Sequence, residues 1–262
     1  MTSLIGNAPV DGVDVAALLG IPISAEQERA VQAPLKPCAV IAGAGTGKTT
    51  VMAARVVWLV ASRLVSPEEI LGLTFTNKAT AELSERIESN LTRVGLLTSE
   101  QPRPTVATYD SFAGTLVNDY GAWDGISTGA HLITGARAYQ LAAEVVMGLD
   151  KAPLAATHMG PTFIAQAVVK LAGAMASHDA SPGKVRRADA RWRQMLLAAP
   201  TKRGGDRYAD IDKWLSRVDE REELLDLVAA YQNLKKERGL VEFGDRMVQA
   251  LHLVTHHPRV GE

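Results

Sequence analysis

The sequence predicts an α/β protein that has an incomplete parallel sheet and an all-helical insertion. Three short apolar runs, at residues 38–42, 70–75 and 105–108, alternate with helical patterns, which is typical of parallel strands joined by helices. From residue 113 onward, apolar residues recur at spacings of three and four, which indicates helices without strands. A glycine-rich loop between the first run and its helix indicates a phosphate site.

Composition limits the class of protein. The chain of 262 residues exceeds the usual size of one domain, and 47% hydrophobic with 22% charged residues is ordinary for a globular protein. A net charge of -1 excludes a generally basic nucleic-acid binder, so any DNA contact must come from local patches. The single cysteine, Cys38, predicts a buried thiol in a reducing cytoplasm, and no stretch is long enough to cross a membrane.

The N-terminal part is expected to begin with a weakly structured arm over residues 1–20, in which Asp11 and Asp14 flank a short helical turn. A helix then starts after Ser24, which is a predicted N-cap with Gln27 as its capping-box partner. Alternatively, the amide of Gln27 both donates to and accepts from an adenine ring, since this residue lies just upstream of the glycine-rich loop.

The loop itself has the residue types that hold a triphosphate. A buried strand over Cys38–Ala42 and a helix over Thr49–Leu64 are expected, which puts the glycines at a helix N-terminus. There Lys48 is expected to reach the β- and γ-phosphates and the Thr49 hydroxyl to ligate Mg2+. The alternative is a glycine-rich turn that ends in Lys-Thr by chance, since alanine stands where the strict pattern has its first glycine.

The residues around this loop resemble a known family. The segment Ile23-Ser-Ala-Glu-Gln-Glu-Arg-Ala-Val31 and the loop Ala42-Gly-Ala-Gly-Thr-Gly-Lys-Thr49 are similar to the Q-motif and the Walker A loop of superfamily 1A DNA helicases, the UvrD/Rep/PcrA and RecB-like group. Alanine is the usual residue at position 42 in that family. The resemblance implies a RecA-like P-loop NTPase sheet that binds ATP and Mg2+, with catalytic roles for Lys48 and Thr49. The residues that it assigns to the nucleotide are Gln27, Gly43, Ala44, Gly45, Thr46, Gly47, Lys48, Thr49 and Thr50.

Two further stretches resemble the DNA-binding motifs of the family. Leu73-Thr-Phe-Thr-Asn-Lys-Ala-Thr-Ala-Glu-Leu83 resembles motif Ia, and Thr108-Tyr-Asp-Ser-Phe112 resembles motif Ib. Phe75 offers a face for base stacking, and the alternative is a core aromatic at a strand end. Asp110 replaces the usual histidine and would repel a phosphate, so it is left out of the predicted contacts. The residues assigned to DNA are Thr74, Phe75, Thr76, Asn77, Lys78, Thr108, Tyr109 and Ser111.

The insertion resembles domain 1B of the family in position and type. After a loop expected at residues 88–104 and the third strand, helical patterns cover 113–120, 136–149, 162–175, 191–197 and 213–238. The stretch 184–207 carries eight basic residues against two acidic ones, which fits either a solvated surface or a patch for the DNA backbone. Its aromatic residue, Trp192, either stacks on a base or packs within the insertion.

The last stretch contains Gly239-Leu-Val-Glu-Phe-Gly-Asp-Arg-Met247, which resembles the family's return from domain 1B to domain 1A, with Glu242 replacing the usual aspartate. The neighbouring His256 and His257 cannot share one helix face, so a loop is expected rather than a metal site. The predicted organisation is an arm (1–20), the first part of the RecA-like domain 1A (21–112), domain 1B (113–238) and the return segment (239–262).

No apolar strand followed by Asp-Glu occurs after Lys48, so the Walker B pair of the family is missing from this sequence. We therefore expect an N-terminal fragment that by itself hydrolyses almost no ATP. The resemblance implies that the whole protein is a cytoplasmic ATP-dependent DNA helicase or translocase, 3'-5' in direction, acting in DNA repair or recombination. The expected partners are single-stranded DNA, the junction with duplex DNA, further helicase domains of the same chain and a helicase-nuclease subunit, without a membrane. The alternatives are a non-enzymatic nucleotide- or DNA-binding module and another P-loop NTPase, such as a kinase or switch.

Overall fold

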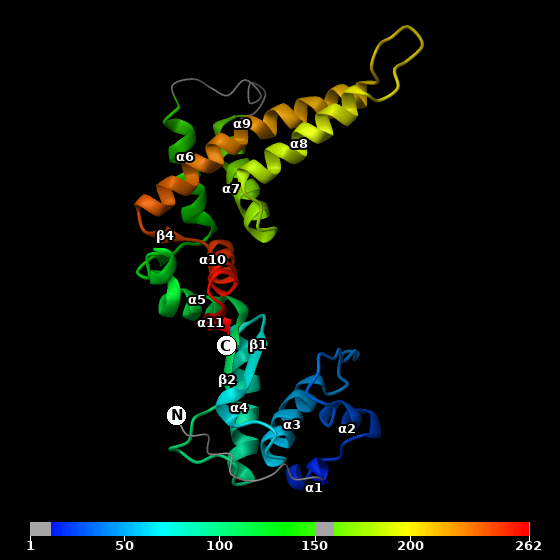
Figure 1. Cartoon of the computed structure of the whole chain (residues 1–262), viewed down its shortest axis with the longest axis vertical. Helices are drawn as coiled ribbons and strands as arrows, with labels where there is room; N and C mark the ends of the chain where they lie inside the picture. Colours follow the sequence, from blue (N-terminus) through cyan, green and yellow to red (C-terminus); the bar gives the residue numbers. More distant parts are fainter. Residues whose placement is uncertain (1–11, 150–159, 262) are drawn as a thin grey trace. The chain divides into compact units, whose positions relative to one another are not determined.

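A computed structural model describes residues 12–149 and 160–261 of the chain (Figure 1). The chain divides into an N-terminal unit, Met1–Phe112, and a C-terminal unit, Ala113–Glu262. Among the described residues helices dominate, and the strands form two small parallel sheets of two strands each. The expected parallel pairing is therefore present, within a chain that is mostly helical.

The N-terminal unit contains one parallel strand pair. Its elements are α1 (Val15–Leu19), α2 (Ala25–Val31), α3 (Lys48–Ala61), η1 (Pro67–Glu69), β1 (Leu71–Thr74), α4 (Asn77–Arg93) and β2 (Thr105–Thr108). The strands β1 and β2 pair in parallel, with Thr74 opposite Thr108 at their carboxyl ends, and α4 makes the crossover that a parallel pair requires. Both strands confirm the sequence prediction. The loop expected from residue 88 was placed too early, because α4 continues to Arg93 and buries Leu91.

The start of α2 also confirms the prediction. The Ser24 hydroxyl accepts from the backbone N-H of Gln27 at 3.3 Å, and the Gln27 side-chain oxygen accepts from the backbone N-H of Ser24 at 2.9 Å. Two N-H groups of the first turn are thus satisfied reciprocally.

Residues 1–20 were predicted to form a weakly structured arm, and for residues 12–20, which the structure describes, this prediction is wrong. Asp14 caps the short helix α1 by accepting from the backbone N-H of Ala17 at 3.0 Å. Val15 and Leu19 are each 2% exposed and belong to the core of the N-terminal unit. This core anchors a helix too short to be stable alone. Asp11 lies outside the described residues.

The strand predicted over Cys38–Ala42 is also wrong. These residues form no strand, Ile41 is 99% exposed, and Val40 is 57% exposed. A strand needs a partner for its backbone hydrogen bonds, and within the described residues β1 pairs only with β2. Cys38 is consequently exposed, which corrects the expectation of a buried thiol.

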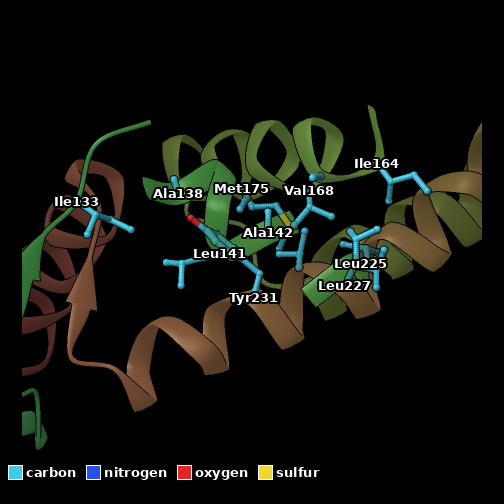
Figure 2. Packing of buried hydrophobic residues seen from close by; sticks show 14 residues of the cluster. Ile133, Ala138, Leu141, Ala142, Ile164, Val168, Met175, Leu225, Leu227 and Tyr231 are labelled. Atoms are coloured by element: carbon cyan, nitrogen blue, oxygen red, sulfur yellow. The ribbon is translucent and has the colours of Figure 1, made fainter. Parts of the chain in front are cut away.

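The C-terminal unit is built from helices around one large core. Its elements are α5 (Tyr109–Tyr120, which begins in the N-terminal unit), η2 (Gly121–Asp124), β3 (His131–Leu132), α6 (Gly135–Met147), α7 (Pro161–Ser177), α8 (Pro182–Leu197), α9 (Ala209–Glu237), β4 (Leu240–Val241), α10 (Phe243–His256) and α11 (Pro258–Gly261). Figure 2 shows side chains from α6, α7 and α9 meeting in this core, among them Leu141, Val168 and Leu225. The helical patterns of the sequence are confirmed, but α8 begins earlier than predicted. Its first turns were missed because they are mostly polar.

One short strand departs from the expectation of helices alone in residues 113–238. The strand β3 pairs in parallel with β4, with His131 opposite Leu240 and Leu132 opposite Val241. Each strand has only two residues, which is too short to show an alternating pattern in the sequence.

A buried lysine joins the end of α9 to the start of α10. Lys235 is 2% exposed, and its Nζ donates to Glu242 Oε2 and to Asp245 Oδ2, each at 2.6 Å. The Tyr231 hydroxyl donates to the same Glu242 oxygen at 2.8 Å. Burial, followed by the bond to Glu242, raises the pKa of the Tyr231 hydroxyl. Glu242 and Asp245 also form the capping box of α10, so one cluster fixes both helix ends.

Candidate nucleotide and DNA-binding site

The glycine-rich loop has two positions that need glycine. Gly45 and Gly47 have φ values of +75° and +83°, in the left-handed region that other residues rarely adopt. Gly43 is less constrained, since a Cβ placed there would lie 3.6 Å from a Thr46 methyl carbon, an ordinary contact. The Thr46 hydroxyl donates to the Gly43 carbonyl at 2.9 Å and so closes the loop on itself.

Lys48 lies over this loop at the start of α3. Its Nζ donates to the carbonyl of Gly43 at 2.6 Å and to that of Ala42 at 3.2 Å. The N-cap of α3 is Gly47, which has no side chain to cap the first turn, so the positive end of the helix dipole is available to an anion. Thr49 is exposed in this first turn, and its hydroxyl oxygen is of the kind that ligates Mg2+. The arrangement can hold a phosphate group.

The structure brings Gln27 to the loop. Its Nε2 donates to the Thr46 carbonyl at 3.1 Å while its Oε1 accepts from Ser24. Each side of its amide thus has one partner, and one N-H and one oxygen lone pair remain for pairing with an adenine ring. A Cβ at Gly47 would lie 3.2 Å from Gln27 Nε2, so glycine also allows this close approach.

Two arginines support the loop and were missed as site residues in the sequence. The Nη1 of Arg55 donates to the carbonyls of Val31 and Ala33 at 2.9 and 2.7 Å, and it thereby holds the chain that leads into the loop. The Nη1 of Arg86 on α4 donates to the Thr50 hydroxyl at 2.9 Å. These partners are distant in sequence, so no local pattern could reveal them.

The carboxyl ends of β1 and β2 bring two aromatic side chains together. Because Thr74 and Thr108 are register partners, the following residues Phe75 and Tyr109 lie side by side, with ring centroids 5.1 Å apart and planes tilted by 39°. Phe75 is 89% exposed, which excludes the alternative of a core aromatic, and Tyr109 is 42% exposed. The pair offers an open aromatic face of the kind on which unpaired bases stack.

The start of α4 holds the other candidates from the first DNA-binding stretch. Thr74 is 9% exposed, and its hydroxyl lies 2.5 Å from the Thr80 hydroxyl. The Thr76 hydroxyl caps the first turn of α4. These two threonines therefore shape the local backbone. Asn77 and Lys78 are exposed in that first turn, where a phosphate would meet backbone N-H groups.

Thr108 and Ser111 play a similar part at the start of α5. The Thr108 hydroxyl accepts from the backbone N-H of Ser111 at 3.1 Å and donates to its hydroxyl at 2.9 Å. One carboxylate oxygen of Asp110 is buried, so that atom does not face solvent where DNA would lie.

Among the described residues, four of the eight basic residues in the stretch 184–207 pair with acidic side chains, and three of these four pair with acids of α9. The ion pairs that join α8 to α9 are Arg186 with Glu222 and Asp226, Arg193 with Asp219, and Asp189 with Arg221. Lys184 pairs with Asp179, and Arg207 pairs with Asp212. The acidic partners of these four residues neutralise about half of the positive charge that the sequence offered to a DNA backbone. Exposed cations remain at Arg187, Arg191, Lys202 and Arg203.

The adjacent histidines near the C-terminus serve a packing contact. The Nε2 of His257 lies 2.7 Å from Asp124 Oδ1, and His256 Nδ1 lies 3.5 Å from the other oxygen of that carboxylate. The hydrogen bond from His257 holds the pKa of Asp124 below its usual value. The expected loop is wrong for His256, which ends α10. In residues 12–149 and 160–261 no group of three His, Cys, Asp or Glu side chains could hold a metal ion, and no helix is long and apolar enough to cross a membrane.

Comparisons with known proteins agree with the resemblance read from the motifs. The family model for the UvrD/REP helicase N-terminal domain matches residues 23–262. A probable DNA helicase II homologue of Rickettsia conorii is 37% identical over 97 residues, which are 37% of this chain and 14% of that protein. The ATP-dependent DNA helicase UvrD1 of Mycobacterium leprae is 48% identical over 65 residues, which are 25% of this chain and 8% of that protein. DNA helicase II of Escherichia coli is 45% identical over 75 residues, which are 29% of this chain and 10% of that protein.

The chain thus matches only a small part of the length of these relatives. The family model, in contrast, covers nearly the whole chain and includes the glycine-rich loop, the β1–α4–β2 segment and the helical unit. This chain belongs to the family of UvrD/REP helicase N-terminal domains.

Proposed function

We propose that this chain binds ATP with Mg2+ at the glycine-rich loop and single-stranded DNA at the Phe75–Tyr109 face. The whole protein would be an ATP-dependent DNA helicase or translocase that moves 3'-5' and acts in DNA repair or recombination. The names of the relatives, which are DNA helicases, support this proposal.

In the proposed nucleotide complex, the Nζ of Lys48 leaves the carbonyls of Ala42 and Gly43 and donates to β- and γ-phosphate oxygens instead. The loop N-H groups and the start of α3 would hold the same phosphates, and the Thr49 hydroxyl is the residue that would hold Mg2+. The ion would neutralise the charge that develops on the phosphates during hydrolysis. Gln27 pairs with the adenine ring through the N-H and the oxygen lone pair that its bonds to Thr46 and Ser24 leave unused.

The observation that carries the DNA part is the register of β1 and β2. This register joins Phe75 and Tyr109, which are 34 positions apart in the sequence, into one exposed aromatic face at the carboxyl ends of two parallel strands. Ligands of open α/β sheets bind at this edge. Asn77 and Lys78 lie beside it at a helix start, where a backbone phosphate would be held.

The test is the affinity for a labelled single-stranded oligonucleotide, measured by fluorescence anisotropy. Replacing Phe75 by alanine removes a stacking face, which is worth about 1–3 kcal/mol per base, so we expect the Phe75→Ala variant to bind at least about fivefold more weakly. Phe163→Ala is the matched control, because Phe163 is also an exposed phenylalanine (63%) but lies on α7. Equal affinities for wild type and Phe75→Ala would remove this face from the DNA site.

A further inference from the structure

A groove in the C-terminal unit has no part in the proposed function so far. It lies between α7 and α9, with Trp192 of α8 at its edge, and has a volume of about 570 Å³. All its lining residues come from these three helices of one unit. Its size falls within the range of sites for small ligands, or for one or two bases of a larger one.

Two tryptophans give this groove an aromatic wall. Trp192 and Trp214 are each 50% exposed, and their ring centroids lie 6.2 Å apart with planes tilted by 34°. Packing within the unit accounts for only half of each indole surface, since both rings remain open to solvent. The pair is an exposed stacking surface, similar in chemistry to the Phe75–Tyr109 face of the N-terminal unit.

The charges around the tryptophans favour an anionic ligand. Lys170, Arg217 and Arg221 line the groove, and the guanidinium carbon of Arg217 lies 5.6 Å from the Trp214 ring centroid. Arg221 is already paired with the buried Asp189, and Glu220 contributes one carboxylate to the lining. Lys170 and Arg217 therefore leave the groove with an excess of positive charge beside a planar stacking surface.

We propose that this groove is a second binding site for single-stranded DNA, in which unpaired bases stack on Trp192 and Trp214 while Lys170 and Arg217 contact the neighbouring phosphates. A stacking surface with adjacent cations fits a strand whose bases are accessible, whereas the bases of a duplex are stacked on one another. The inference rests on the proposed function, because it takes DNA as the ligand of this chain.

Photo-crosslinking locates the contacts directly. A single-stranded oligonucleotide that contains 5-bromodeoxyuridine is irradiated with the chain, and the crosslinked peptides are identified by mass spectrometry. We expect crosslinks at Trp192 or Trp214 in addition to those at the Phe75–Tyr109 face. The groove crosslinks should persist in the Phe75→Ala variant and disappear in a Trp192→Ala/Trp214→Ala variant. They should also remain in the control variant Trp123→Ala, because Trp123 is 53% exposed but lies outside the groove.

The outcomes separate the two proposals. Crosslinks at Phe75 or Tyr109 without any in the groove would overturn the second site and leave the proposed function standing. Absence of crosslinks everywhere would overturn both. Groove crosslinks that a duplex of the same sequence displaces as well as a single strand does would contradict base stacking.

A milder variant covers the case in which the double substitution fails to fold. Arg217→Gln keeps both tryptophans and removes one cation from the groove. For the single-stranded oligonucleotide, we expect the slope of log affinity against log salt concentration to be smaller in magnitude by about 0.7 for Phe75→Ala/Arg217→Gln than for Phe75→Ala alone. An unchanged slope would mean that Arg217 contacts no phosphate and would overturn the site.

Discussion

Lys48 in the N-terminal unit and Lys235 in the C-terminal unit both donate two hydrogen bonds, but their surroundings are opposite. Lys48 is exposed and donates to the neutral carbonyls of Ala42 and Gly43. Lys235 is 2% exposed and donates to the carboxylates of Glu242 and Asp245. A phosphate can replace neutral carbonyls at low cost, whereas buried carboxylates would be left without a counter-charge.

The contrast extends to the elements that carry each lysine. Lys48 begins α3 after a loop that is exposed and that follows the unpaired, exposed segment 38–42. Lys235 lies near the end of a helix of 29 residues whose face is buried against α6 and α7 (Figure 2). The first lysine is placed to exchange partners, and the second one is placed to hold two helices together. Substitutions should therefore affect binding at one site and stability at the other.

The largest expected effect on stability is that of Lys235→Met. Methionine keeps the apolar stem but leaves Glu242 and Asp245 without their counter-charge. The free energy of unfolding should therefore fall by about 2–4 kcal/mol. This loss is smaller than for a fully buried ion pair, because both carboxylates are partly exposed. Urea denaturation measures this change. Lys236→Ala, at the next and exposed position, should change stability by less than about 0.5 kcal/mol. Equal stabilities of the two variants would mean that the buried cluster has no structural role.

A smaller effect is expected within the glycine-rich loop, where two alanine substitutions separate backbone strain from added bulk. In Gly45→Ala the new Cβ meets no atom within 4 Å, but alanine is forced to φ +75°. This strain should lower the free energy of unfolding by about 1–2 kcal/mol. If the loop rearranges to relieve the strain, the cost should appear in nucleotide affinity instead. Gly43→Ala makes only an ordinary contact with Thr46 and should be close to neutral. Urea denaturation and nucleotide titration of both variants check this, and a stronger effect of Gly43→Ala would show that the loop has a different backbone.

Local signals in the sequence predicted much of this structure. The capping box of Ser24 and Gln27 and the two strands of the N-terminal unit depend on neighbouring residues, so they could be predicted from local sequence patterns. The loop residues are placed by the same short-range chemistry, and two of its three glycines adopt the positive φ for which glycine is suited. The assignments of single residues to ATP and DNA, and the division of the chain from residue 21 into domain 1A, domain 1B and a return segment, stay predictions.

Structural features that depend on contacts between residues far apart in the chain could not be predicted from the sequence. The segment 38–42 has the composition of a strand, but composition does not supply a hydrogen-bonding partner. In the basic stretch, Arg186 and Arg193 looked available to DNA, because the acids that pair with them lie 26–40 positions further along, on α9. Likewise, Arg55 and Arg86 reach the loop region only through the packing of α2, α3 and α4.

The most direct test of the account is the affinity of the chain for a fluorescent ATP analogue with Mg2+, compared between wild type, Lys48→Ala and Lys36→Ala. Lys48 should contribute charge-assisted hydrogen bonds to phosphate worth about 1.5–3 kcal/mol, so Lys48→Ala should bind at least about tenfold more weakly. Its free energy of unfolding should change by less than about 0.5 kcal/mol, because its present partners are exposed carbonyls. The exposed Lys36 is the control and should leave affinity unchanged. Equal affinities for wild type and Lys48→Ala would contradict a phosphate site at this loop.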